Sequence, residues 1–144
     1  MKHSDANILV AEKIIDVRFN EVDAVGIAWH GSYAIYFEEA RAAFGAKYGL
    51  EYSRIYDSGY YAPITEIHFN FKRFLKYLDR IRVVITYRPC EAAKLIFDYE
   101  IFNCATNELI ATGNSVQVFL NREFQLVFTS PDFYKEWKRK NGVL

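Results

Sequence analysis

Apolar and polar residues alternate along much of the chain, which is the pattern of β-strands with one buried and one exposed face. The first alternating stretch is residues 13–19, where Ile15, Val17 and Phe19 share one face. The later stretches that indicate strands are residues 66–72, 80–88, 94–101 and 109–120. Because each strand has an apolar and a mainly polar side, antiparallel pairing is expected, and Gly113 is expected to bend or bulge the last strand.

Between the first and second of these strands, the apolar period changes to that of a helix over residues 32–48. The recurring apolar positions are Tyr33, Phe37, Ala40, Phe44 and Tyr48. Gly49 indicates the end of this helix. The segment is also rich in alanine, and small side chains would let a curved sheet wrap closely around the helix. An amphipathic helix lying on a flat sheet fits the same residues.

The C-terminal region predicts one further helix. Ser130 and Pro131 have the sequence of a helix cap followed by the first helical residue, and the helix is expected to end in Lys138–Lys140. The expected order is therefore strand, helix, four strands and short helix. No repeat, low-complexity tract or Gly/Pro-rich linker divides the 144 residues, so residues 1–144 are expected to form a single domain.

Composition narrows the classes of function. Eighteen basic residues balance eighteen acidic ones, so no global field favours nucleic acid or an anionic membrane. Cys90 and Cys104 lack C-x-x-C spacing and the three histidines lack ligand spacing, so neither a disulfide framework nor a metal site is expected. The N-terminus is not a convincing signal peptide, and no apolar run approaches the roughly 20 residues that span a bilayer. A cytoplasmic protein without a membrane span is expected.

The loop before the long helix has the residues for acyl chemistry. Asp23 lies ahead of the helix start, across a loop that Gly26 can bend. A helix N-terminus offers free backbone N–H groups and a partial positive charge, so it can bind a carbonyl or oxyanion while a nearby carboxylate acts on it. This arrangement suits acyl transfer or hydrolysis, although an aspartate in such a loop is also a common turn former.

This segment resembles the signature of the hotdog-fold thioesterases. The matching residues are Asp23, Gly26, His30, Tyr33 and the run Phe37–Arg41. The likeness is to the branch that contains the 4-hydroxybenzoyl-CoA thioesterases and the YbgC-like acyl-CoA thioesterases. The resemblance implies an α+β hotdog fold, with a five-stranded antiparallel sheet wrapped around one long central helix, and a homodimer or homotetramer with active sites near the subunit interface.

The resemblance also implies an activity and two roles. The expected reaction is hydrolysis of an acyl-CoA to a free acid and CoA, without metal or bound cofactor. The residue at the position of Asp23 is catalytic in these enzymes, as nucleophile or as general base, and the backbone N–H at the position of His30 polarises the thioester carbonyl. The His30 ring could instead orient the carboxylate or water. His30 is typical of the YbgC-like members, whereas Trp29 and Ala62–Ile64 resemble the hydroxybenzoyl branch, so the subfamily stays open.

Substrate contacts are assigned less directly. Basic side chains at the pocket mouth would neutralise the CoA phosphates, and the candidates are Lys76 and Lys94. Aromatic walls would suit an aryl or medium-length acyl chain, and the candidates are Trp29, Tyr33, Tyr60 and Tyr61. The sequence lacks the Gly-x-Ser-x-Gly elbow that would indicate a serine hydrolase. It also lacks a glycine pattern that would indicate a nucleotide cofactor.

Three other functions fit the same sequence. An acyl carrier protein could deliver the acyl group, and this acidic partner would favour a basic patch for which Arg80, Arg82 and Arg88 are available. A non-catalytic carrier of small apolar ligands could use the aromatic cavity. A folding or assembly module would use Asp23 only as a turn residue. The acyl chain length, its aromatic or aliphatic nature and the choice of dimer or tetramer remain open.

Overall fold

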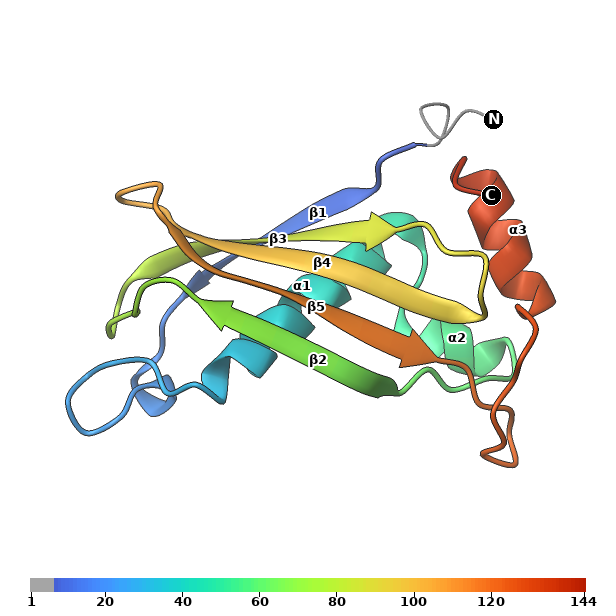
Figure 1. Ribbon diagram of the computed structural model, residues 1–144, viewed down its shortest axis with the longest axis horizontal. Coiled ribbons are helices and arrows are strands. Elements are labelled where there is room, and N and C mark those ends of the chain that lie inside the picture. The colour runs from blue at the N-terminus through green and yellow to red at the C-terminus, as the bar shows by residue number, and fades with distance from the viewer. Residues whose placement is uncertain (1–6) are drawn as a thin grey trace.

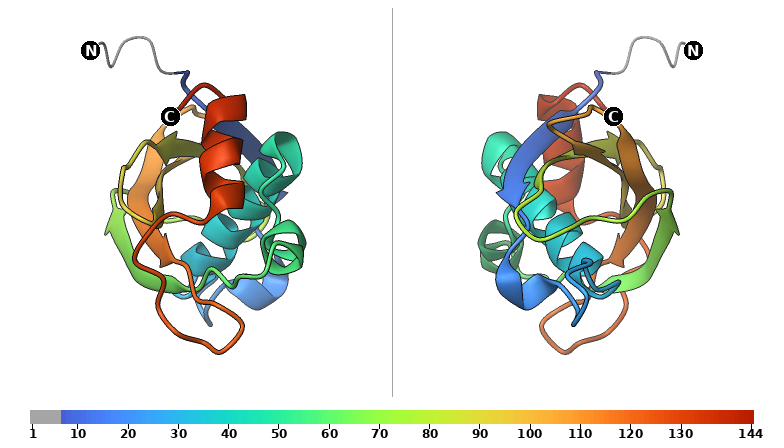
Figure 2. Two further views of the ribbon diagram at one scale, coloured as in Figure 1. Left: turned by 90° about the vertical axis from the view of Figure 1, so that its right-hand side faces the viewer. Right: turned by 90° about the vertical axis from the view of Figure 1, so that its left-hand side faces the viewer.

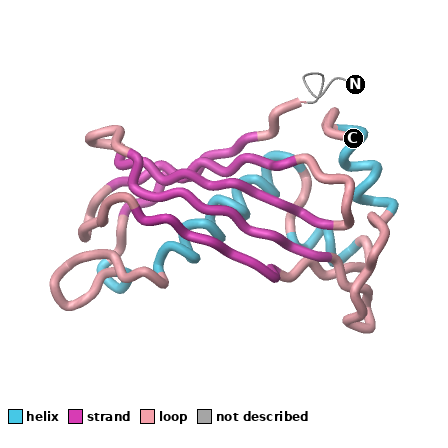
Figure 3. The backbone as a smooth tube through the Cα atoms, viewed as in Figure 1, coloured by secondary structure: helices cyan, strands magenta, loops and turns pink. Residues whose placement is uncertain are grey.

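One antiparallel sheet and one long helix make up most of the structure, a computed structural model that describes residues 7–144 (Figure 1). The strands are β1 (Val10–Asp16), β2 (Ile64–Phe71), β3 (Arg80–Arg88), β4 (Lys94–Asn103) and β5 (Leu109–Val118). The helices are α1 (Ser32–Tyr48), α2 (Tyr52–Asp57) and α3 (Asp132–Lys140), with a 3₁₀ helix at Phe19–Glu21 (Figure 3).

The strands lie in the order β1-β3-β4-β5-β2, and every neighbouring pair is antiparallel. The two edges of the sheet are therefore β1 and β2. Figure 2 shows the sheet curving around α1, which lies against its inner face, while α3 lies across one end. The predicted α+β architecture, with five antiparallel strands wrapped around the long helix, is confirmed, and the alternative of a flat sheet is wrong.

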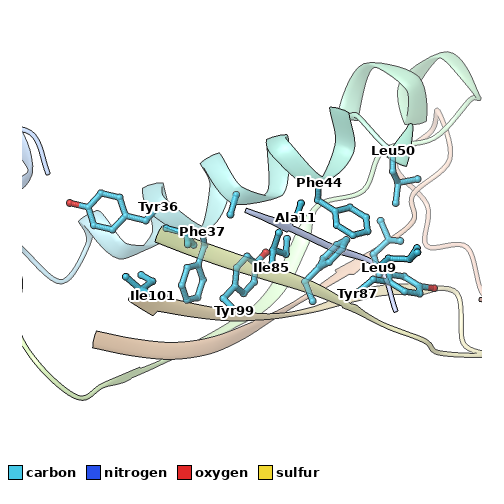
Figure 4. Packing of buried hydrophobic residues seen from close by; sticks show 14 of the residues in the cluster. Leu9, Ala11, Tyr36, Phe37, Phe44, Leu50, Ile85, Tyr87, Tyr99 and Ile101 are labelled. Carbon is cyan, nitrogen blue, oxygen red and sulfur yellow. The ribbon is translucent and has the colours of Figure 1, made fainter. Parts of the chain in front are cut away.

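Buried aromatic side chains hold α1 against the sheet. The inward positions predicted for β3 and β4 are all buried: Ile81, Val83, Ile85, Tyr87, Leu95, Phe97, Tyr99 and Ile101. From the helix, Phe37 stacks on Tyr99 with ring centroids 4.0 Å apart and planes 5° apart (Figure 4). Such pairs contribute about 0.5–1.5 kcal/mol beyond the burial of their area. The core therefore joins the middle of the sheet to the middle of α1.

Gly113 serves close packing rather than a bulge. It pairs regularly with Phe69 and Tyr99, and the register shifts of the sheet lie elsewhere, at Ile64/Glu66 and Ile101/Phe102. A Cβ added to Gly113 would lie 2.6 Å from the Phe37 ring and 2.3 Å from the His68 carbonyl oxygen. The predicted bulge at Gly113 is wrong, because the glycine is needed where α1 approaches β5 most closely.

Several element boundaries differ from the prediction: β1 begins earlier, at Val10, β2 covers Ile64–Phe71, β4 continues to Asn103 and β5 ends at Val118. The first strand ends at Asp16, because the chain turns into the 3₁₀ helix that leaves Phe19 75% exposed. Helix α2 lies in what the sequence suggested was only a connection. Helix α3 begins at Asp132, with Pro131 as its N-cap. The limits of α1 are as predicted, and Gly49 ends it in the left-handed conformation at φ 75°.

A membrane-spanning helix or a metal-binding group of side chains would each indicate a particular class of site. No helix within residues 7–144 is both long and apolar enough to cross a membrane. Across the same described range, no three His, Cys, Asp or Glu side chains are grouped so that they could hold a metal ion. The prediction about a signal peptide concerns residues that lie mostly outside the described range.

Candidate active site

Asp23 organises the loop that precedes α1. Its backbone N–H donates to the Ile27 carbonyl at 2.8 Å, and its carbonyl accepts from Gly26 N–H at 3.0 Å. Its side-chain Oδ1 accepts from the N–H groups of Val25 at 3.0 Å and Ile27 at 3.1 Å. Gly26 has φ +84°, which glycine adopts without strain. Asp23 is therefore a turn former, and its Oδ2 accepts no hydrogen bond from any residue in 7–144.

The turn just before α1 presents free backbone donors. Trp29 N–H donates to the Glu21 carbonyl, Ser32 N–H to Trp29 and Tyr33 N–H to His30. By contrast, the N–H groups of His30 and Gly31 donate to no other described residue, and no side chain caps the helix. These two groups lie where the partial positive charge of the helix is concentrated, so they can bind an anionic or strongly polarised oxygen.

The His30 ring is exposed and lies against Trp29, with ring centroids 5.0 Å apart. No hydrogen bond joins its imidazole to the Asp23 carboxylate or to any other part of the described chain. The helix itself begins two residues later, at Ser32. This arrangement favours a role for the backbone of His30 over a role for its ring.

A buried acid that the sequence analysis missed fixes this turn. The Glu21 side chain is 5% exposed and accepts hydrogen bonds from the Tyr36 hydroxyl at 3.0 Å and from Arg18 Nε at 2.5 Å. The Glu21 carbonyl accepts from Trp29 N–H and from the Ser32 hydroxyl. Burial, reinforced by the nearby Glu21 carboxylate, raises the pKa of Tyr36, so its hydroxyl stays a donor. Position alone, two residues before Asp23, gave little sign of this role.

A cleft of about 370 Å³ opens beside the free N–H groups, between the start of α1 and the end of β2. Its lining residues are Ala28, His30, Tyr33, Phe71, Lys72, Arg73 and Phe74. Tyr33 is buried and meets Phe71 edge-on, with ring centroids 4.8 Å apart, and burial raises the pKa of its hydroxyl to about 12. The cleft is thus mainly apolar, with two cations at one side. Figure 1 shows that the loop before α1 and the end of β2 lie at the same end of the molecule.

The predicted substrate residues are not all in this cleft. Tyr33 lines it, and the exposed Trp29 lies next to the lining residue His30. The backbone of Lys76 bridges to Ile27, so Lys76 lies near the Asp23 loop. Lys94 pairs with Val118 at the opposite end of the sheet, because it begins β4. The cations that line the cleft are Lys72 and Arg73, which directly follow β2 and were not singled out from the sequence.

Tyr61 belongs to a second cleft, at the other end of β2. This cleft has a volume of about 600 Å³ and is lined by Glu38, Tyr52, Tyr61, Ala62, Pro63, Ile64, Leu120 and Phe124. Tyr61 and Phe124 stack with ring centroids 4.8 Å apart and planes 12° apart. Tyr60 does not line either cleft and instead packs against Phe133 near α3.

The three arginines considered for an acidic partner are already paired. Arg80 Nε donates to Asp16 at 2.8 Å, Arg82 lies 3.3 Å from Glu12, and Arg88 pairs with Asp98. Each pair joins neighbouring strands on the outer side of the sheet. The predicted basic patch is therefore neutralised by acids of the same chain.

Comparison with known proteins finds relatives of this chain both in sequence and in structure. A family model described as the thioesterase-like superfamily matches residues 17–137. The "Putative acyl-CoA thioesterase YneP" of Bacillus subtilis is 27% identical over 134 residues, which cover 90% of this chain and 96% of the relative. The DHNA-CoA thioesterase of Staphylococcus aureus has a TM-score of 0.80 at 26% identity, covering 91% and 90% of the two chains. A hypothetical protein of Aquifex aeolicus gives 0.77 at 26% identity, covering 88% and 98%.

Proposed function

The chain belongs to the thioesterase-like superfamily, and from this membership we propose that it hydrolyses an acyl-CoA to a free carboxylic acid and CoA. The names of YneP and of the Staphylococcus aureus neighbour support a thioester hydrolase that acts on CoA esters. The observation that carries the proposal is the pair of free N–H groups before α1, beside an apolar cleft and the Asp23 loop.

The N–H groups of His30 and Gly31 bind the thioester carbonyl oxygen in this proposal. As the carbonyl carbon is attacked, negative charge develops on that oxygen, and the start of α1 stabilises it. The Glu21 contacts to Trp29 and Ser32 hold the two donors in place before the substrate arrives. Removing one such donor typically slows an enzyme by about 10²–10³.

Asp23 supplies the carboxylate, through the oxygen that the loop does not use. As general base, it takes a proton from water while the water oxygen attacks the carbonyl carbon. As nucleophile, it attacks that carbon itself and forms an anhydride, which water then opens. In both routes the carbon–sulfur bond breaks and CoA leaves as a thiolate that takes up a proton. Asp23 itself is not among the residues that line the cleft, and the choice between the two routes stays open.

The phosphates of CoA are assigned to the cations beside the cleft. Lys72 forms no ion pair with another described residue, whereas Arg73 lies 3.5 Å from Glu108 on the surface. Lys76, near the Asp23 loop, is a third candidate. Lys94 is left out of the cleft of its own chain because it lies at the far end of the sheet. Basic side chains suit this role because they form charge-assisted hydrogen bonds with phosphate.

A homodimer through β2 is the assembly that we propose. Strand β2 is a sheet edge, and such an edge offers unpaired backbone groups to another strand. Its ends expose apolar side chains, with Ile64 40% and Phe71 51% exposed. If β2 pairs antiparallel with its copy along its length, a continuous sheet forms, and each Ile64 lies near Phe71 of the partner subunit. A tetramer would need a further interface.

The test is thiol release from a panel of short, medium, long and aryl acyl-CoAs, each matched with the N-acetylcysteamine thioester of the same acid. We expect turnover of a subset of the panel and a lower KM for the CoA form, because only CoA brings phosphates to Lys72 and Arg73. Turnover without preference for CoA would contradict the phosphate assignment. No turnover of any member would contradict the proposed function.

A further inference from the structure

Four exposed apolar side chains lie close together at the end of the molecule that holds the Asp23 loop. They are Phe19, Val25, Tyr77 and Leu78, whose exposed fractions are 75%, 78%, 45% and 67%, and we call them the apolar tip. None of the four lines either of the two clefts. Scattered exposed apolar side chains are ordinary on a protein surface, but a contiguous group marks a surface that binds another molecule.

Two segments of the chain join to form the apolar tip. The Phe19 ring meets the Tyr77 ring edge-on, with centroids 5.6 Å apart. Tyr77 N–H donates to the carbonyl of Gly26, the neighbour of Val25, at 3.2 Å. Figure 1 shows the loop before α1 and the connection between β2 and β3 at the same end of the molecule. The tip is therefore one surface, built where these two connections meet.

Leu78 has a backbone conformation that leucine rarely adopts. Its φ is 73°, in the left-handed region where a bulky side chain is strained but glycine or asparagine is not. Hydrogen bonds of the turn impose this conformation, because Leu78 N–H donates to the Val17 carbonyl at 3.1 Å and Val17 N–H donates to the Asp79 carbonyl at 2.8 Å. The Leu78 side chain is mostly exposed, so packing within the chain offsets little of the strain. Strain at such a position points to a role in binding.

The β2–β3 connection, which supplies half of the tip, is positively charged although the whole chain is neutral. Residues 72–78 contain no acid and three cations, namely Lys72, Arg73 and Lys76. Within residues 7–144, Lys72 and Lys76 form no ion pair, and Arg73 pairs only with the exposed Glu108, 3.5 Å away. Asp79 follows directly, and its carboxylate accepts the Lys76 backbone N–H at 2.8 Å. Apolar and positively charged side chains are thus interleaved along this connection.

Apolar side chains interleaved with cations are the composition of surfaces that lie on anionic lipid. The apolar groups enter the boundary between headgroups and acyl chains, while the cations stay level with the lipid phosphates. Other partners explain less of the surface. A nucleic acid would account for the cations but not for four exposed apolar side chains. A second copy of the chain would place the same cations opposite each other, because a two-fold interface uses the same patch of both subunits.

We propose that the apolar tip attaches the protein to an anionic lipid surface. Phe19, Val25 and Leu78 enter among the headgroups, and Lys76 lies at the lipid phosphates. The left-handed turn holds the Leu78 side chain outward, where lipid rather than protein buries it. This attachment does not depend on the proposed thioesterase function.

The attachment also places the cleft that contains His30. Lys72, Arg73 and Phe74 line that cleft and belong to the same connection as Leu78. Lipid bound at the tip therefore lies next to the cleft. Lys72 and Arg73 add to the attraction from the edge of the cleft, because charges act over about 8 Å at physiological ionic strength.

The first test is co-sedimentation with vesicles of phosphatidylcholine alone, and of phosphatidylcholine with phosphatidylglycerol in equal parts. We expect the wild type to bind the mixed vesicles, and its binding to weaken as salt is raised. The tip variant, Val25→Ser combined with Leu78→Asn, should bind at least about tenfold more weakly, because two aliphatic groups no longer enter the lipid. The control is Ile8→Ser, which removes an 81% exposed side chain before β1, at the other end of the molecule, and should bind like the wild type.

Thermal unfolding verifies that these variants fold, and asparagine suits the left-handed position of Leu78. Lys76→Gln should weaken binding to the mixed vesicles by about fivefold. A wild type that binds neither kind of vesicle, or binds both equally, would overturn the proposal. A tip variant that binds like the wild type would overturn it as well.

The second test reports which surface meets the lipid. Trp29 is 54% exposed in the loop that also carries Val25, whereas Trp137, the other tryptophan of the chain, is 6% exposed. We expect tryptophan emission to shift to shorter wavelength when the mixed vesicles are added, and the shift to disappear in Trp29→Phe. A bound protein that shows no shift would be attached through another surface, which would overturn the proposal.

Sedimentation velocity without lipid distinguishes a lipid surface from a second copy of the chain. We expect the wild type and the tip variant to have the same mass in solution, because the tip makes no contact between copies. A smaller mass of the tip variant would assign the tip to such a contact and overturn the proposal.

Discussion

The two oxygens of the Asp23 carboxylate have different surroundings. Oδ1 accepts two backbone N–H groups and keeps the loop closed, whereas Oδ2 has no partner among residues 7–144. The aspartate can therefore form the turn and still offer an oxygen for chemistry. The sequence motif around Asp23 predicted both that this residue matters and that it lies close to the start of α1. Glu21 could not be predicted in the same way, because its burial depends on the contact with Tyr36, which comes from α1.

His30 gives a prediction at the same scale. Because its ring makes no hydrogen bond to Asp23 and its N–H is free, we expect His30→Ala to lower kcat by less than about tenfold. The measurement is kcat and KM with an acyl-CoA that the wild type cleaves, after thermal unfolding has verified that the variant folds. A general acid or base contributes about 10²–10⁴. A loss of that size would place the imidazole in the reaction.

At the scale of elements, the alternation of apolar and polar residues identified the strands, and the helical spacing of apolar residues identified α1. Both patterns are visible in the sequence because the buried face of each element must be apolar. Ile81 and Leu95 are the first inward residues of β3 and β4, whose predicted inward positions are all buried, and α1 occupies the predicted residues. Helix α2 was missed because six residues are too few to reveal a period. Gly113 was misinterpreted because its reason is a distant residue, Phe37, which contacts it only in the folded protein.

The packing of α1 on β5 predicts a large effect of one methyl group. In Gly113→Ala the new Cβ would meet the Phe37 ring and the His68 carbonyl oxygen, and the latter belongs to the β2–β5 pairing and cannot easily move. We expect the free energy of unfolding to fall by about 3 kcal/mol, as for an overpacked core. Urea unfolding measures it, with Asn114→Ala on the same strand as the control. Equal stabilities of the two variants would argue against the close approach.

At the scale of the whole molecule, the topology of the sheet decides which residues lie near the cleft. Lys94 was predicted to bind phosphate because it opens a strand, but β4 runs antiparallel to its neighbours and begins at the end of the sheet away from the cleft. The strand order β1-β3-β4-β5-β2 makes β2 an edge, and the two clefts lie at opposite ends of β2. A single sequence does not reveal strand order, so Lys72 and Arg73 emerged only from the fold. The proposed dimer would reunite the two clefts.

Burial of Tyr33 predicts how the stability of the molecule depends on pH. Because its pKa is raised from 10.0 to about 12, the folded state holds the proton more tightly than the unfolded state. Its contribution is therefore complete below pH 10 and is lost as the pH rises toward 12. Tyr33→Phe should make the alkaline fall in unfolding free energy shallower by up to about 1 kcal/mol per pH unit. Urea titrations at pH 9 to 11.5 measure this slope, and identical slopes would contradict the assignment.

The central claim is that the Asp23 carboxylate performs thioester hydrolysis, and Asp23→Asn tests it most directly. The amide oxygen of asparagine can still accept the hydrogen bonds of Val25 and Ile27, so the loop should stay closed. We therefore measure CoA release by wild type and Asp23→Asn on the same acyl-CoA, with thermal unfolding of both. The account predicts equal unfolding temperatures and a kcat lowered by at least about 10². A variant that folds normally and keeps the wild-type kcat would contradict it.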